Sequence, residues 1–260
     1  MTQFSTLAGT RLDRELGTDD STVLFKTARR NAAVNEGQET FARLTKCLKR
    51  RSTITIPSTA AEFNLLSTTV ITSGDFVEYD VEQPQFRYTN ASSVVTVLAG
   101  DDLPRRDVAW LNRYEPQWQV STVAAGTEQW PQGWYDRVDG GNRYFGLWPA
   151  PSSGSSASME VLLPYVARPT PMSSATDEPF TVNSSVRTDL RPYHQAVVHY
   201  AAHLLEKLRR DDQASQSQLQ QFMGYVTLWM QDQRRKGGNG LTFAKSYFVK
   251  RGDRGTDPRR

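Results

Sequence analysis

Three histidines near the C-terminal end offer the best chance of metal chemistry in this chain. His199 and His203 are four residues apart, with His194 a little earlier. On a helix, both imidazoles of such a pair project from one face and can bind a metal ion. Zinc proteases need a glutamate directly after the first histidine, whereas this chain has Tyr200 there, and no cysteine or carboxylate lies between or beside the pair. We therefore expect a packed or subunit-facing pair.

Tryptophans crowd the centre of the chain and suggest a second kind of chemistry, the stacking of sugar rings. They are Trp110, Trp118, Trp130, Trp134 and Trp148. A glycosidase would also need two carboxylates that meet through the fold, and the scattered carboxylates show no recognisable pair. Large aromatic side chains are also typical of cores and protein interfaces. We favour that second interpretation.

Other catalytic signatures are missing from the sequence. It has no GxSxG, Walker, GxGxxG or CxxC motif, and Cys47 is the single cysteine, which excludes an intrachain disulfide. Cys47 falls near the end of a predicted amphipathic helix, where we expect it to be buried and unreactive. The sequence therefore predicts no catalytic residue, no metal site and no cofactor, and we do not expect an enzyme.

Charge is unevenly distributed along the 260 residues. From Arg234 to Arg260 there are nine Lys or Arg against two Asp, a net charge of +7, so the remainder carries −4 because the whole chain carries +3. A basic tail can bind nucleic acid, an acidic protein surface or anionic lipid. No apolar run approaches the ~20 residues that span a bilayer, and the N-terminus lacks the pattern of a signal peptide. We expect a protein without a membrane partner, made and used in the cytoplasm or in a particle assembled there.

The elements that position these residues follow the order helix, strands, helix, which predicts an α+β fold. Residues 1–51 are expected to hold an N-terminal arm and one or two helices, from about Thr22 after the N-cap candidates Asp19, Asp20 and Ser21. Gly37 leaves open whether this is one helix or two. Basic residues suit the end of the helix, where they complement its dipole; they are Lys46, Lys49, Arg50 and Arg51.

Residues 52–168 are expected to form an inserted β domain. Short β-rich runs alternate with turns rich in Gly, Pro and Ser, which is typical of an antiparallel sandwich or barrel. The runs are 53–56, 62–66, 76–81, 94–98, 143–148 and 159–166. One or two helical turns are expected at 105–114, entered through Pro104.

Residues 169–236 are expected to contain a proline-rich linker, extended over the surface, and two amphipathic helices. These should pair with the N-terminal helix as a small bundle. We predict that the bundle core consists of Phe41, Leu44, Leu48, Val197, Ala201, Leu204, Leu208, Phe222, Val226 and Trp229.

Residues 237–260 are expected to form a basic, extended C-terminal arm. Gly237, Gly238 and Gly240 would act as a hinge, and the following segment, 241–250, alternates in the manner of a strand without a partner. The alternative is a solvated terminus that orders nowhere.

Several sequence pieces, in order over roughly residues 20–235, resemble the head-to-tail adaptor, or connector, proteins of tailed bacteriophages. They are 34–38 with 41–45, 107–118, 132–135, 144–151 with its P-x-P turn, 163–165, 191–194 and 200–202. The order and spacing of the set, and not any single piece, carry the resemblance. The basic tail after Gly240 lies outside the resemblance.

The resemblance implies a structural virion protein that forms a ring, commonly of twelve copies, beneath the portal. Such a ring extends the DNA channel, binds copies of itself, the portal protein and a downstream tail or head-completion protein, and lets DNA pass without sequence-specific binding. An acidic body suits a channel that must not hold the duplex. We expect the arm to dock on the portal by adding a strand to it, with contacts from Phe243, Lys245, Tyr247, Phe248, Lys250 and Arg251.

Two functions of other classes stay open from the residues alone. A nucleic-acid-binding module would act through the basic tail, and its affinity would fall steeply with salt. A phage protein that binds or hydrolyses carbohydrate would use the central tryptophans.

Overall fold

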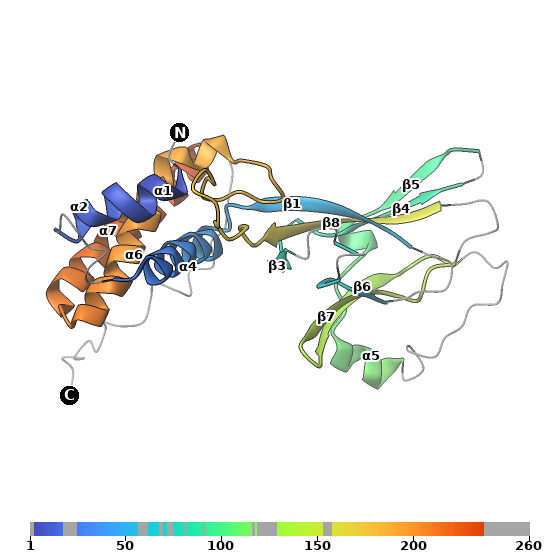
Figure 1. Cartoon of the computed structure of the whole chain (residues 1–260). Helices are drawn as coiled ribbons and strands as arrows, with labels where there is room; N and C mark the ends of the chain where they lie inside the picture. Colours follow the sequence, from blue (N-terminus) through green and yellow to red (C-terminus); the bar gives the residue numbers. More distant parts are fainter. Residues whose placement is uncertain are drawn as a thin grey trace, which may run out of the picture.

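The computed structural model shows a helical bundle beside a β domain (Figure 1). It describes residues 3–17, 25–56, 62–67, 70–71, 75–80, 82–90, 92–115, 118, 129–152 and 158–236. N-terminal and C-terminal helices flank antiparallel sheets, so the predicted α+β class is confirmed. The expected hinge and arm, residues 237–260, lie outside the described residues.

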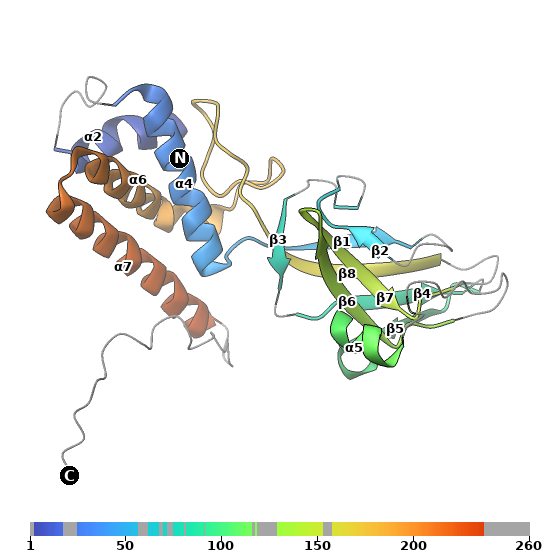
Figure 2. The same ribbon diagram turned by 90° about the horizontal axis from the view of Figure 1, so that it is seen from below.

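Helices from both ends of the chain build the bundle. They are α1 (Phe4–Thr6), η1 (Leu7–Arg11), α2 (Leu12–Glu15), α4 (Thr27–Thr45), η3 (Thr188–Tyr193), α6 (His194–Arg209) and α7 (Asp212–Lys236). The central helix is α6, with α4 and α7 packed against it and the short N-terminal helices lying across it (Figure 2). Helices α4 and α6 are far apart in the sequence. Packing between their side chains, and not the helix propensity of either segment, therefore holds them together.

The first long helix differs from its predicted form at both ends. The expected caps at 19–21 and start at Thr22 lie outside the described residues, and α4 begins at Thr27. It continues through Gly37, where a Cβ would lie 2.7 Å from the carbonyl oxygen of Val197, so the missing side chain lets α4 and α6 approach closely. The helix ends at Thr45, with Lys46 in the left-handed region. Lys49, Arg50 and Arg51 therefore start a strand, and their prediction as part of a helix end was wrong.

The bundle core contains most, but not all, of the predicted side chains. Phe41, Leu48, Val197, Ala201, Phe222, Val226 and Trp229 are buried, and Leu204 is partly buried. Leu44 is 40% exposed and Leu208 is 55% exposed, so their placement in the core was wrong. Leu44 lies outside the buried face of α4, which runs through Val34, Gln38, Phe41 and Thr45. Leu208 is in the last turn of α6, beyond the point at which Ser215 of α7 already contacts His203.

The linker between the β domain and η3 is partly buried, contrary to the expectation of a surface path. Phe180 and Met172 enter the bundle core, and Phe180 packs on Phe41 with ring centroids 5.2 Å apart. Gln38 fixes the linker, since its amide nitrogen donates to the carbonyl oxygen of Thr170 at 3.1 Å and its oxygen accepts from the Phe180 N–H at 3.1 Å. The linker is thus part of the bundle.

Two antiparallel sheets form the β domain. The five-stranded sheet has the order β1 (Lys49–Thr55), β8 (Ser158–Ala167), β4 (Gln85–Thr89), β5 (Val95–Leu98), and β3 (Phe76–Tyr79) also pairs with β8. The three-stranded sheet has the order β2 (Glu62–Asn64), β7 (Asn142–Trp148), β6 (Gly133–Asp139). Strands β4 and β6 were not predicted. Within the described residues the sheets form a sandwich and no closed barrel.

A helix adds a third layer to the sandwich, on the outer side of the small sheet. Val161 of β8, Phe86 of β4 and Phe145 of β7 belong to the common core between the sheets. Helix α5 (Val108–Tyr114) contacts β6, and its Leu111 packs with Tyr135 against the outer side of the small sheet. Its N-cap is Asp107, whose carboxylate accepts from the Ala109 N–H, and not the region of Pro104 as predicted. On the outer face of the five-stranded sheet, Pro164 and Val166 of β8 are buried, whereas Thr55 and Val97, farther from the bundle, are exposed.

Candidate interaction surfaces

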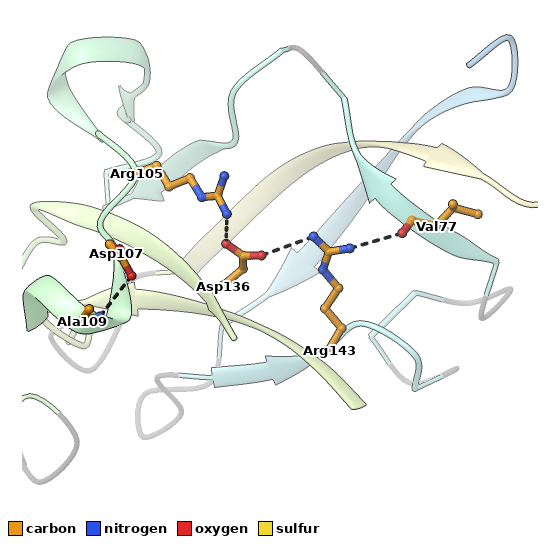
Figure 3. A network of polar contacts seen from close by, with 6 residues as sticks. All are labelled: Val77, Arg105, Asp107, Ala109, Asp136 and Arg143. Atoms are coloured by element: carbon orange, nitrogen blue, oxygen red, sulfur yellow. Dashed lines mark hydrogen bonds and ion pairs between the residues drawn. The ribbon is translucent and has the colours of Figure 1, made fainter. Parts of the chain in front are cut away.

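A chain of charged groups joins the two sheets. Asp136 of β6 pairs with Arg105 and, at 3.3 Å, with Arg143 of β7, which also donates to the carbonyl oxygen of Val77 on β3 at 3.3 Å (Figure 3). The Arg143 guanidinium lies 5.0 Å from the ring centre of Tyr79. The Asp136 carboxylate thus has both of its oxygens paired with guanidinium groups. Because Arg143 also binds the main chain of β3, the network fixes β3 against the small sheet.

A second ion pair holds the small sheet together. Arg137 of β6 contacts both carboxylate oxygens of Glu62 on β2, at 2.8 and 2.7 Å, and the Tyr135 hydroxyl donates to the same carboxylate at 3.0 Å. These hydrogen bonds lower the pKa of Glu62, because they favour its charged form. A carboxylate held ionised by three donors is unsuited to act as a general acid.

Two of the three histidines bridge helices of the bundle. Nδ1 of His199 lies 2.7 Å from Oε1 of Gln218, and Nδ1 of His203 lies 2.8 Å from Oγ of Ser215, so both imidazoles bridge α6 and α7. His194 is buried against Phe180, and its burial lowers the pKa to about 4. In the described part of the chain, no three His, Cys, Asp or Glu side chains gather as ligands for a metal ion.

Cys47 lies just after α4 in the core, and its burial raises the pKa of the thiol to about 11. The thiolate is the reactive form, and at neutral pH the thiol stays protonated. This environment agrees with the expectation of an unreactive side chain.

The central tryptophans contact aromatic rings of their own chain. Trp134 stacks on Phe145 at 5.8 Å and Trp118 lies edge-on to Tyr135 at 4.8 Å. Trp130 contacts Tyr88 at 5.1 Å, and Trp110 contacts Trp148 at 5.8 Å. The five rings are divided between the core of the sandwich and the layer beneath α5, so they do not line up as a platform for sugars.

The exposed apolar side chains differ between the two bodies. On the bundle, Leu44, Leu208 and Leu228 lie on three different helices. In the β domain, Val94 directly precedes β5, and Val95 and Val97 lie on it. These three residues are 57, 56 and 45% exposed. Sequence reasoning identified this segment as a strand and missed its exposure, which depends on its place at the edge of the sheet.

Net charge also differs between the β domain and the C-terminal segment. Residues 49–167, which contain the β domain, hold thirteen Asp or Glu against nine Lys or Arg, so the excess negative charge of −4 is located there. The +7 segment begins in the last turn of α7, which ends at Lys236, and the six arm residues from Phe243 to Arg251 lie outside the described residues. The acidic excess and the basic segment are therefore separate along the sequence. Among the described helices, none is both long enough and apolar enough to span a bilayer.

Comparison with known proteins gives one clear relationship. The family model described as SU10 adaptor protein matches residues 2–242, almost the whole chain. No curated protein matches the chain. The family match spans both bodies, from α1 to the end of α7, and it confirms the resemblance to phage adaptors that the ordered sequence pieces indicated. The chain belongs to the SU10 adaptor protein family, a family of bacteriophage adaptors.

Proposed function

We propose that this protein is one subunit of a ring that sits beneath the phage portal, extends the DNA channel and provides the platform for tail attachment. The family match over residues 2–242 is the observation that carries the proposal. The role is structural and belongs to the virion, with no bond-making chemistry. The resemblance to other adaptors gives twelve as the number of copies in this ring.

Two features of the molecule support a ring. Ring subunits contact one another through two different complementary surfaces. A bundle joined to a β domain offers two distinct bodies for such contacts (Figure 1). The acidic β domain also suits a DNA channel, since excess Lys and Arg would bind phosphates and retain the duplex.

The C-terminal segment is the proposed portal-docking arm. Its glycines at 237, 238 and 240 directly follow α7, so an arm there would leave from the end of the bundle. Added as a strand to the portal, its main chain would give affinity and Phe243, Tyr247 and Phe248 would give specificity. Lys245, Lys250 and Arg251 would meet acidic groups of the portal.

A deletion tests the arm. Removal of residues 237–260 should abolish association with purified portal, measured by native mass spectrometry, while far-UV circular dichroism stays that of the folded protein because the bundle and β domain are intact. A matched control replaces Lys245, Lys250 and Arg251 by Gln, which should weaken binding and reduce its salt dependence. Undiminished portal binding by the deletion variant would rule out this role for the arm.

DNA binding distinguishes the adaptor from a nucleic-acid-binding module. A module of that kind would bind short duplex DNA in isolation, with affinity that is lost on deletion of the tail and falls steeply with salt. The adaptor should bind the portal more tightly than it binds DNA at physiological salt.

A further inference from the structure

The five-stranded sheet ends in two strands whose outer edges have no partner among the described residues, β1 and β5. An edge strand presents unpaired N–H and C=O groups that can accept another strand, and folded proteins usually protect such edges with charged residues. Lys49, Arg50 and Arg51 lie on β1. On β5, by contrast, there is no charged side chain, and Val95 and Val97 are about half exposed.

We propose that β5 of one subunit pairs with β1 of the next, so that the five-stranded sheet continues from copy to copy around the ring. The inference rests on the proposed function, because it assigns the contact that would close that ring. A junction of two different edges is a heterologous contact, which is the kind that builds rings. The occupant of the β5 edge is thus a second copy of this chain.

Strand directions favour this junction. The path β1–β8–β4–β5 is antiparallel at every step, so β5 runs opposite to β1. When a second copy is placed beside the first with its strands in the same direction, its β1 is therefore antiparallel to the first copy's β5. The alternation of the sheet continues across the boundary, as in an ordinary antiparallel ladder.

The side chains on the two edges are also compatible. Thr55, Glu160, Arg87 and Val97 form one row across the sheet by their register, so Val97 and Thr55 lie on the same face. When the row continues into the next copy, Val97 of one copy lies beside Thr55 of the next. Pairs of β-branched side chains stabilise neighbouring strands.

Charges at the strand ends are complementary. Asp101 and Asp102 are exposed and follow β5 closely, and in an antiparallel junction they lie toward the end of β1 that carries Arg50 and Arg51. Arg51 already pairs with Glu82 at 2.6 Å, but both side chains are more than half exposed. Such surface pairs contribute little to stability, so Arg51 can exchange its partner at low cost.

Cysteine cross-linking tests the pairing directly. Two double variants, Val97→Cys with Thr55→Cys and Val97→Cys with Thr53→Cys, cover two neighbouring registers on the same face. Cys47 stays in place because it is buried. After mild oxidation of portal-bound protein, at least one double variant should give a ladder of covalent multimers on a non-reducing gel, because each copy would be linked to two neighbours. Each single variant can give no species larger than a dimer.

A charge variant tests the same edge without cross-linking. Val97→Lys should lower the yield of rings about tenfold or more, since a lysine discourages pairing of an edge strand. The matched control is Val138→Lys on β6, where the residue is 71% exposed on the other sheet. It should leave the yield within about twofold, since an exposed substitution away from the junction is nearly neutral.

The outcomes separate the two proposals. Rings of the unmodified protein on the portal, seen by electron microscopy, establish the proposed function before any variant is compared. If such rings form but both double variants stop at dimers, or Val97→Lys assembles as well as Val138→Lys, the strand pairing is wrong and the ring remains. If the unmodified protein forms no ring with portal, both proposals fail together.

Discussion

The helical bundle and the β domain pair their polar side chains in different ways and expose different surfaces. The bundle encloses Gln38, His199 and Gln218 with hydrogen-bond partners, and its exposed apolar side chains, Leu44, Val186, Leu208 and Leu228, are scattered. The β domain is crossed by ion pairs, yet it leaves Val94, Val95 and Val97 exposed on the edge strand β5 and the residue before it. Isolated exposed apolar residues are normal, whereas neighbouring ones on a free edge are typical of interaction sites. Exposed apolar side chains are therefore scattered on the bundle and clustered on one strand of the β domain.

Truncation of the bundle core should have the largest effect. Phe41 is fully buried between Phe180, Tyr193 and Phe222. Phe41→Ala should lower the free energy of unfolding by about 3–5 kcal/mol, because it removes buried apolar surface and leaves a cavity. Leu44→Ala on the same helix is the control and should cost less than about 1 kcal/mol. Urea denaturation followed by circular dichroism measures both, and equal losses would contradict the burial difference between the two positions.

Acid should destabilise the bundle through His194. Its pKa is about 4 in the fold and about 6.5 in the unfolded chain, so acid favours the unfolded state, which binds the proton first. The stability due to the neutral imidazole is complete above pH 6.5 and is lost as the pH falls to 4, a change of roughly 3 kcal/mol. Thermal unfolding between pH 7 and 4 should show a steeper fall for the unmodified protein than for His194→Phe. Parallel curves for the two proteins would show that His194 does not contribute to the loss of stability in acid.

Two glycines give smaller effects of opposite sign. A Cβ on Gly146 would lie 2.1 Å from Cζ of Tyr135, a buried ring backed by Trp118, so Gly146→Ala should destabilise the β domain by about 1–3 kcal/mol. Gly224 lies in α7 with open space around its Cβ position, so Gly224→Ala should stabilise the bundle by up to about 1 kcal/mol. Thermal unfolding measures both changes, and a tolerated Gly146→Ala would show that the small sheet is less tightly packed than the bundle.

The sequence indicated the bundle better than the sandwich, for physical reasons. The apolar period of α6 extends over several turns, so Val197 and Ala201 could be placed, while Leu44 misled because a short apolar series fits more than one helix face. Strand β6 was missed because Trp134 and Tyr135 are both buried, on opposite sides of the small sheet, which hides the alternation. Strand β4 is short and follows a proline.

The candidate surface was beyond sequence reasoning for another reason. That Val95 and Val97 form an edge depends on which strands pair, and the pairing joins residues far apart in the chain, such as Arg87 with Glu160. Likewise Asp136 meets Arg105 and Arg143 only through the fold. Long-range juxtapositions of this kind leave no local pattern.

The β domain leaves and rejoins the bundle at one place, since Lys49 at the start of β1 and Val166 near the end of β8 are register partners. The two points where the polypeptide crosses between the bodies are therefore neighbours in space. An insertion with adjacent ends can be shortened, enlarged or replaced without moving the elements that flank it. The β domain can therefore change in size or surface while the helices that flank it keep their packing.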